Sequence, residues 1–230
     1  FQKSAGGLVS GLSAYLGSLK DSAFTTSQYI WIGWPGISVE DKEKEKLELK
    51  ALTDFNAYPV FLSEDVMENF YHGFCNKTIW PLFHYFPSFT VYDETYWNHY
   101  KHVNENFCNA VMKIIKPDDV VWIHDYHLML LPKLLREKMP DVPIGFFLHI
   151  PFPAFEIFQL LPGKWRSEIL QGLLGADLIG FHTFDYTQCF LRCVLRILGH
   201  EHNMGQIVAD DHLAKADTFP MGIDFGRFYS

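Results

Sequence analysis

The chain has 230 residues, of which 48% are apolar and 20% are charged. This apolar share excludes a wholly disordered chain, and the length allows one large domain or two small ones, at about 100–200 residues per domain. With 19 basic and 27 acidic residues the net charge is −8, so no general electrostatic attraction to nucleic acid or to an anionic membrane is expected.

Helix and strand patterns alternate along the whole chain. In chain order they predict a helix over 7–19, a strand over 28–33, a helix over 40–52, a strand over 58–63, helices over 64–73 and 95–115, a strand over 119–124, a helix over 127–138, a strand over 143–149, a helix over 165–174, a strand over 177–181, a helix over 184–198, and short strands at 206–209 and 216–219. The strands are apolar on both faces, which is typical of a parallel sheet covered by helices. The sequence therefore predicts one doubly wound α/β domain.

Local signals support two of the helix starts. Ser38 followed by Asp41 resembles a capping box for the helix over 40–52, whose KEKEK run is expected to face solvent. Ser63 is expected to cap the helix that follows it. The helix over 95–115 has a clear amphipathic stripe that includes Tyr100 and Phe107.

The four cysteines, Cys75, Cys108, Cys189 and Cys193, are too few for a disulfide framework in a chain of this length. They are interpreted as buried, reduced thiols of a cytoplasmic protein. The chain has no run of about 18 apolar residues, so no membrane span is predicted. It starts at Phe1 without a Met and without a signal-peptide pattern, and is therefore expected to be an excerpt of a longer protein.

Polar groups follow three successive predicted strands. The strand over 119–124 ends in His124-Asp125-Tyr126-His127, the next strand ends at His149, and the third is followed by His182. Ligands of doubly wound sheets bind outside the carboxyl ends of the strands, so these groups are expected to form one site. A metal hydrolase built on His124, Asp125, His127, His149 and His182 is an alternative interpretation, although their spacing matches no known ligand pattern.

Two further segments are candidates for ligand binding. Gly6 and Gly7 open a predicted helix and leave backbone N–H groups free for a phosphate, although a plain turn would look the same. The segment from Tyr71 to Tyr85 is dense in aromatic and polar side chains. Rings of this kind stack on sugar faces, while a packed aromatic loop is the alternative.

Five segments together resemble the trehalose-6-phosphate synthases of glycosyltransferase family 20: Ser4-Ala5-Gly6-Gly7-Leu8, Tyr71 to Tyr85, Trp122 to Leu128, Gly145 to Pro153, and Pro220-Met221-Gly222-Ile223-Asp224. Their order and spacing agree across essentially the whole chain, and WIHDYHLMLLP and GFFLHIPFP are long and specific. The resemblance implies the N-terminal half of a GT-B glycosyltransferase, one Rossmann-like domain of two that face a cleft. Residues 220–230 would start the hinge to a C-terminal nucleotide-sugar domain that this chain lacks.

The resemblance also implies a reaction and a set of site residues. Glucose would pass from UDP-glucose to glucose 6-phosphate with retention of configuration, giving trehalose 6-phosphate and UDP. Tyr71, Trp80 and Asp125 match acceptor-binding residues, and His149 and the Gly6-Gly7 pair match donor-binding residues. Asp125 and His149 are the candidate catalytic groups.

Other expectations follow from the same resemblance. No cofactor and no metal ion are expected, and Asp210-Asp211-His212 is interpreted as an acidic loop. The donor site would be divided between two domains, so the isolated chain is expected to be inactive. The alternative function is a non-catalytic, synthase-like domain of a trehalose-6-phosphate phosphatase or bifunctional protein, used for assembly or sugar-phosphate binding. Homo-oligomerisation is left open by the sequence.

Overall fold

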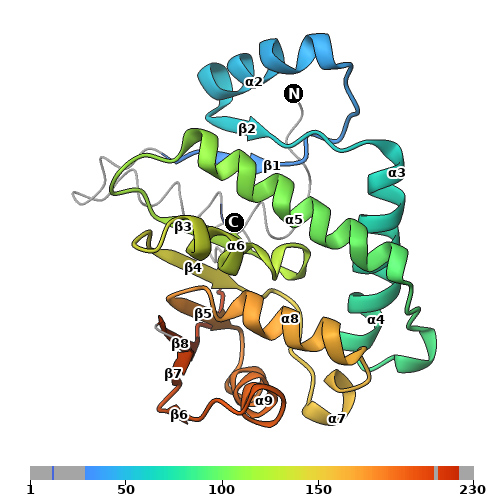
Figure 1. Cartoon of the computed structure of the whole chain (residues 1–230), viewed down its shortest axis with the longest axis vertical. Coiled ribbons are helices and arrows are strands. Elements are labelled where there is room, and N and C mark those ends of the chain that lie inside the picture. Colours follow the sequence, from blue (N-terminus) through green and yellow to red (C-terminus); the bar gives the residue numbers. More distant parts are fainter. Residues whose placement is uncertain (1–11, 13–28, 210–211, 223–230) are drawn as a thin grey trace, which may run out of the picture.

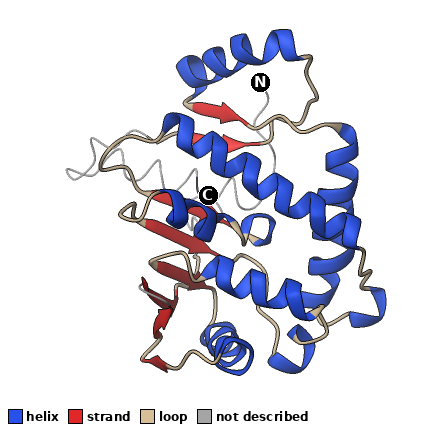
Figure 2. Ribbon diagram, viewed as in Figure 1, coloured by secondary structure: helices blue, strands red, loops and turns tan. Residues whose placement is uncertain are grey.

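A computed structural model describes residues 12, 29–209 and 212–222. The strands are β1 (Trp31–Gly33), β2 (Ala57–Pro59), β3 (Val121–His124), β4 (Ile144–Phe147), β5 (Leu178–Phe181), β6 (His202–Asn203), β7 (Gln206–Ala209) and β8 (His212–Thr218) (Figure 1). The α-helices are α2 (Asp41–Phe55), α3 (Glu64–Met67), α4 (Trp80–Phe83), α5 (Glu94–Ile114), α6 (Leu131–Lys138), α7 (Phe155–Phe158), α8 (Gly163–Leu173) and α9 (Phe184–Cys193) (Figure 2). The π segments are η1 (Glu68–Ile79) and η4 (Val194–Leu198), and the 3-10 segments are η2 (Pro87–Phe89) and η3 (Tyr126–Leu128).

In the described part of the chain, the main sheet has six strands in the order β3-β4-β5-β8-β7-β6. Strands β3, β4, β5 and β8 are parallel, as the sequence predicts, while β7 and β6 pair antiparallel at one edge. The two edge strands depart from the parallel pattern, because β7 and β8 are too close in sequence for the crossover that parallel strands need. Strands β1 and β2 form a separate parallel pair among the described residues.

Helices α5, α6 and α8 pack side by side along the parallel strands (Figure 1). Glycine permits a close approach of α8 to the turn before α6, because a Cβ at Gly172 would overlap the Met129 carbonyl and the Leu130 Cα. The core is rich in rings: Phe152 and Phe181 are both fully buried and contact each other and Phe190 of α9. The packing of α8 onto the turn at 129–130 is therefore tight enough to fix the position of that turn.

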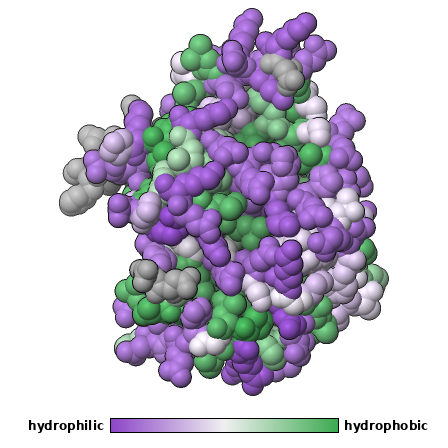
Figure 3. Space-filling view, in the orientation of Figure 1, coloured by the Kyte–Doolittle hydropathy of each residue, from purple (hydrophilic) through white to green (hydrophobic). Residues whose placement is uncertain are grey.

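The helix-start predictions have different outcomes. The Ser63 side chain accepts a hydrogen bond from the Val66 N–H, which confirms it as a cap. The capping box at Ser38 is wrong, because the Ser38 hydroxyl donates to the Leu62 carbonyl and α2 begins after Glu40. The charged run of α2 is mostly solvent-exposed, and hydrophilic residues lie along the top of the molecule in Figure 3.

One predicted helix is longer in the structure than expected, and another is shorter. The helix expected over 64–73 continues through η1 and α4 to Phe83, so the aromatic segment from Tyr71 onward is helical and not a loop. Gly73 does not end this helix, because its missing side chain makes room for the ring of Tyr96 on α5. The helix expected over 127–138 begins only at Leu131, after a 3-10 turn.

The predicted helix over 7–19, with Gly6 and Gly7 before it, lies outside the described residues except for Leu12, which is helical and buried. All four cysteines are free, as expected, but only Cys75, Cys108 and Cys193 are buried, and the expectation of burial is wrong for the half-buried Cys189. No helix in the described part of the chain has the length and apolar character needed to cross a bilayer.

Candidate active site

The parallel strands bring three histidines together at the carboxyl ends of the strands, which form one edge of the sheet. His124 ends β3, and His149 and His182 follow β4 and β5. His124 Nδ1 lies 3.1 Å from His149 Nε2, and the ring centroids of His149 and His182 are 5.7 Å apart. The prediction that these strand ends share an edge is therefore confirmed.

Asp125 directly follows β3 and has a strained backbone conformation. Its φ is 73° and its ψ is 170°, a region that is essentially restricted to glycine. Its N–H donates to the Phe147 carbonyl at 2.8 Å, which ties it to the end of β4. Its Oδ1 accepts from the Tyr126 N–H at 3.0 Å and from the His149 N–H at 3.3 Å. The carboxylate thus links the two strand ends through its own side chain.

Burial raises the pKa of Asp125 and lowers the pKa of His149. Burial raises the pKa of Asp125 to about 6, against the lowering effect of the Tyr126 and His149 amides and of nearby His84. Burial, together with the smaller effects of His124 and His182, lowers the pKa of His149 to about 4. At neutral pH, Asp125 is therefore an ionised acceptor of hydrogen bonds and His149 is a neutral imidazole.

The long helical stretch after Ser63 supplies two aromatic rings. Tyr71 lies in the π segment η1, and its ring stacks on His127 with centroids 5.7 Å apart and planes 10° apart. Trp80 begins α4, and its ring lies 5.7 Å from that of Tyr126. The side chains of Tyr71 and Trp80 are 37% and 45% exposed, so both can still contact a ligand. The rings pack against the two residues that directly follow Asp125.

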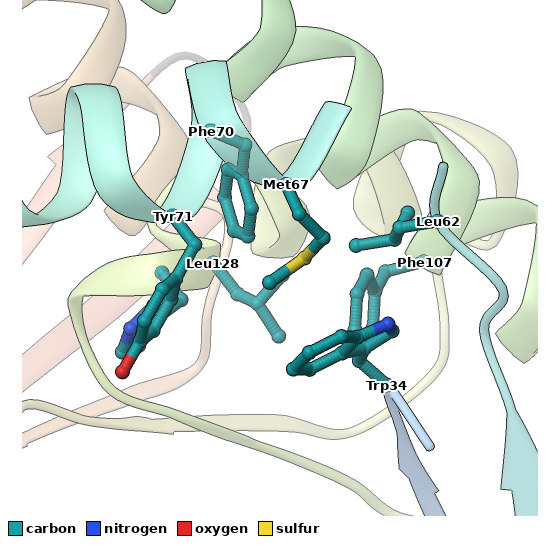
Figure 4. Close-up of a pocket in the computed structure, with 8 residues that line it drawn as sticks. Trp34, Leu62, Met67, Phe70, Tyr71, Phe107 and Leu128 are labelled. Carbon is teal, nitrogen blue, oxygen red and sulfur yellow. The ribbon is translucent and has the colours of Figure 1, made fainter. Parts of the chain in front are cut away.

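An apolar hollow of about 160 Å³ borders Tyr71 (Figure 4). It is lined by Trp34, Leu62, Met67, Phe70, Tyr71, Phe107, His127 and Leu128, and none of these is an acid, a lysine or an arginine. His127 Nε2 is buried there without a hydrogen-bond partner among the described residues. Because burial lowers the pKa of His127 to about 4, this ring is neutral, and the hollow has no fixed charge to hold a phosphate.

The structure places Asp125 in contact with the His149 amide, and it places Tyr71 and Trp80 against the two residues that follow Asp125. Gly6, Gly7, Asp210 and Asp211 lie outside the described residues. Sequence reasoning did not single out His84, whose ring centroid lies 4.1 Å from that of Trp80; its i, i+4 spacing to Trp80 was the available signal. Within residues 12, 29–209 and 212–222, no group of three or more His, Cys, Asp or Glu side chains is arranged to hold a metal ion.

Similar sequences extend over the whole chain. The family model for glycosyltransferase family 20 matches residues 1–230. A bifunctional trehalose-6-phosphate synthase/phosphatase of Thermoproteus tenax is 45% identical over 230 residues, which is 100% of this chain and 31% of the relative. A UDP-forming alpha,alpha-trehalose-phosphate synthase of Dictyostelium discoideum is 46% identical over 226 residues, which is 98% of this chain and 29% of the relative. The chain thus spans about a third of the length of these relatives.

Solved structures share the fold. The N-terminal domain of a Candida albicans trehalose-6-phosphate phosphatase is 35% identical with a TM-score of 0.80, and the match covers 94% of this chain and 46% of that one. A Burkholderia xenovorans UDP-forming synthase in complex with glucose-6-phosphate is 28% identical with a TM-score of 0.77, covering 96% of this chain and 47% of that one. The expectation of a Rossmann-like half of a GT-B glycosyltransferase is thereby confirmed. The chain belongs to glycosyltransferase family 20.

Proposed function

We propose that the protein carrying this chain transfers glucose from UDP-glucose to glucose 6-phosphate, forming trehalose 6-phosphate and UDP. One observation carries the proposal. Asp125 bonds the His149 amide, while the rings of Tyr71 and Trp80 pack on the two residues after Asp125. Candidate acceptor and donor groups therefore meet at one edge of a sheet in a chain of a family whose relatives are named as UDP-forming synthases.

The acceptor sugar is assigned to Tyr71, Trp80 and Asp125. Asp125 is ionised at neutral pH and can accept hydrogen bonds from two sugar hydroxyls, which orients the attacking oxygen. Its side chain is held by two backbone N–H groups, so little reorganisation is needed on binding. The exposed rings of Tyr71 and Trp80 would exclude water, and their O–H and N–H groups can donate to the acceptor phosphate.

The donor glucose is assigned to His149, with Gly6 and Gly7 at the diphosphate. A neutral His149 can bond a sugar hydroxyl without repelling the positive charge that develops on the anomeric carbon. Backbone amides at Gly6 and Gly7 would stabilise negative charge on the departing UDP. With the acceptor attacking on the face from which UDP departs, the leaving phosphate can take the acceptor proton and no protein nucleophile is required.

The experiment is an Asp125→Ala substitution in the protein that carries the chain, assayed by UDP release and by detection of trehalose 6-phosphate. Turnover is expected to fall by at least about 100-fold with the fold retained, since the acceptor loses its orienting carboxylate. Asp141→Ala is the matched control, because Asp141 is an exposed carboxylate outside the site. Near-normal synthesis by Asp125→Ala would refute the assignment.

A second candidate function is favoured by the match to a phosphatase N-terminal domain. In that case the chain is a synthase-like domain that binds sugar phosphates or supports assembly without catalysis. Calorimetry combined with a synthesis assay separates the two. Glucose 6-phosphate binding together with trehalose 6-phosphate synthesis supports the first function, and binding without synthesis supports the second.

We also propose that this chain forms the acceptor-side domain and that residues 220–230 begin a hinge to a nucleotide-sugar domain. The shares of the solved chains that it covers, 46% and 47%, support this division. The isolated chain should then be inactive. Micromolar affinity of the isolated chain for UDP-glucose would contradict the divided donor site.

A further inference from the structure

Helix α5 contributes two fully buried polar side chains to the turn that follows Asp125. The Tyr100 hydroxyl donates to the Tyr126 carbonyl at 2.9 Å and accepts from the Met129 N–H at 2.9 Å. One turn further along α5, Asn104 is equally buried, with no exposed surface. Burial raises the pKa of Tyr100 well above its ordinary value, so the hydroxyl stays protonated and can act as donor and acceptor together.

Asn104 holds the rest of the same turn. Its Nδ2 donates to the His127 carbonyl at 3.2 Å and to the Tyr100 carbonyl at 2.8 Å. Its Oδ1 accepts from the Leu130 N–H at 3.2 Å. Tyr100 and Asn104 therefore satisfy four backbone groups of residues 126–130, two carbonyls and two N–H groups.

This turn needs such external support. It interrupts regular structure between β3 and α6, and its own backbone closes with one bond of 3.3 Å, from the Leu128 N–H to the Asp125 carbonyl. Asp125 at its start has a positive φ that a non-glycine residue keeps only when its surroundings impose it. Buried backbone groups left without partners would favour a rearranged turn.

We propose that Tyr100 and Asn104 are positioning residues, which act from α5 through the backbone of residues 126–130 to fix Asp125. The same bonds fix the His127 ring on which Tyr71 stacks, so one helix sets the distance between the two sides of the acceptor site. Neither residue touches the sugar in this arrangement. The role at the acceptor site rests on the proposed function, whereas the hold on the turn does not.

The test uses Tyr100→Phe in the protein that carries the chain, because this change removes one oxygen atom and keeps the ring. Tyr58→Phe is the matched control, since Tyr58 is also buried but its hydroxyl donates to Glu48 on α2, at 2.9 Å. Hydrogen exchange of the amides at 126–130 is expected to accelerate at least about tenfold in Tyr100→Phe and to stay unchanged in Tyr58→Phe.

Kinetics provide the second readout. In Tyr100→Phe the KM for glucose 6-phosphate should rise at least about fivefold while the KM for UDP-glucose stays within about twofold, a split that general loss of structure would not produce. Unchanged exchange at 126–130 overturns the proposal, and so do KM values that change equally for both substrates.

Two further outcomes are decisive. A wild-type protein without synthase activity refutes the proposed function; the hold on the turn is then decided by hydrogen exchange alone. If Tyr100→Phe does not fold, Asn104→Ala is measured in its place, since it loses the bonds to His127 and Leu130. Exchange at 126–130 that stays at the wild-type rate in folded Asn104→Ala overturns the proposal.

Discussion

Replacing Asp125 with Asn should stabilise the protein at neutral pH while abolishing its proposed activity. Burial raises the pKa of Asp125 from 3.8 to about 6 in the folded state. Each tenfold change in proton affinity is worth about 1.4 kcal/mol, so the ionised carboxylate costs the folded state about 3 kcal/mol above pH 6. Asn has nearly the same shape, can accept the two backbone N–H bonds through its oxygen, and carries no charge.

The pH dependence gives the prediction its sign. Between about pH 4 and pH 6 the folded wild type binds more protons at Asp125 than the unfolded chain does, so its stability falls as pH rises. Asp125→Asn lacks this titrating carboxyl, and all other titratable groups are shared. The free energy of unfolding of the variant should therefore rise relative to that of the wild type by up to about 3 kcal/mol between pH 4 and pH 7.

The measurement is urea unfolding of both proteins at several pH values between 4 and 8, with the difference in free energy of unfolding plotted against pH. A difference that is flat across this range would show that Asp125 has an ordinary pKa. If the wild type instead became more stable relative to the variant as pH rises, the pKa of Asp125 would be lowered in the folded state. Either result would refute the argument from burial.

Three further predictions concern stability and are checked by thermal unfolding. Asp125→Gly should be more stable than Asp125→Ala by about 1–3 kcal/mol, because glycine adopts φ 73° without strain; equal melting temperatures would contradict the strain. Gly172→Ala should lower the free energy of unfolding by about 1–3 kcal/mol, because its Cβ would overlap the turn at Met129. Gly163→Ala serves as the control, since a Cβ at Gly163 would meet only the Arg166 side chain, 3.9 Å away. Phe152→Ala should cost about 3–5 kcal/mol, since this ring is fully buried, and a loss below 1 kcal/mol would mean that the aromatic core is loosely packed.

Element type was largely predictable because it follows from local periodicity. The amphipathic stripe over 95–115 became α5, and the apolar runs before His124, His149 and His182 became neighbouring parallel strands. The failures occur where contacts between distant segments override a local signal. The helix predicted over 64–73 continues to Phe83, and Gly73 inside it accommodates Tyr96 from α5. Ser38 looked like a helix cap, but its hydroxyl bonds the Leu62 carbonyl, 24 residues away.

The site shows the same division. The long motifs that resemble the family predicted Tyr71, Trp80, Asp125 and His149 as candidate site residues, because a motif is a local run of residues that can be read without the fold. Asn104 lies beside Tyr100 on the apolar stripe of α5, a polar residue on a buried face, yet its partners are 23 and 26 residues away and could not be read from spacing.

The sequence by itself determined the family, the alternation of strands and helices, and which side chains meet at the sheet edge. Only the tertiary structure decided the protonation of those side chains and the strained backbone of Asp125. Burial sets the pKa of Asp125 near 6 and that of His149 near 4, and burial is a property of the whole packed molecule. The strain at Asp125 persists because bonds from β4 and α5 hold the turn, and those bonds exist only once distant segments have packed together.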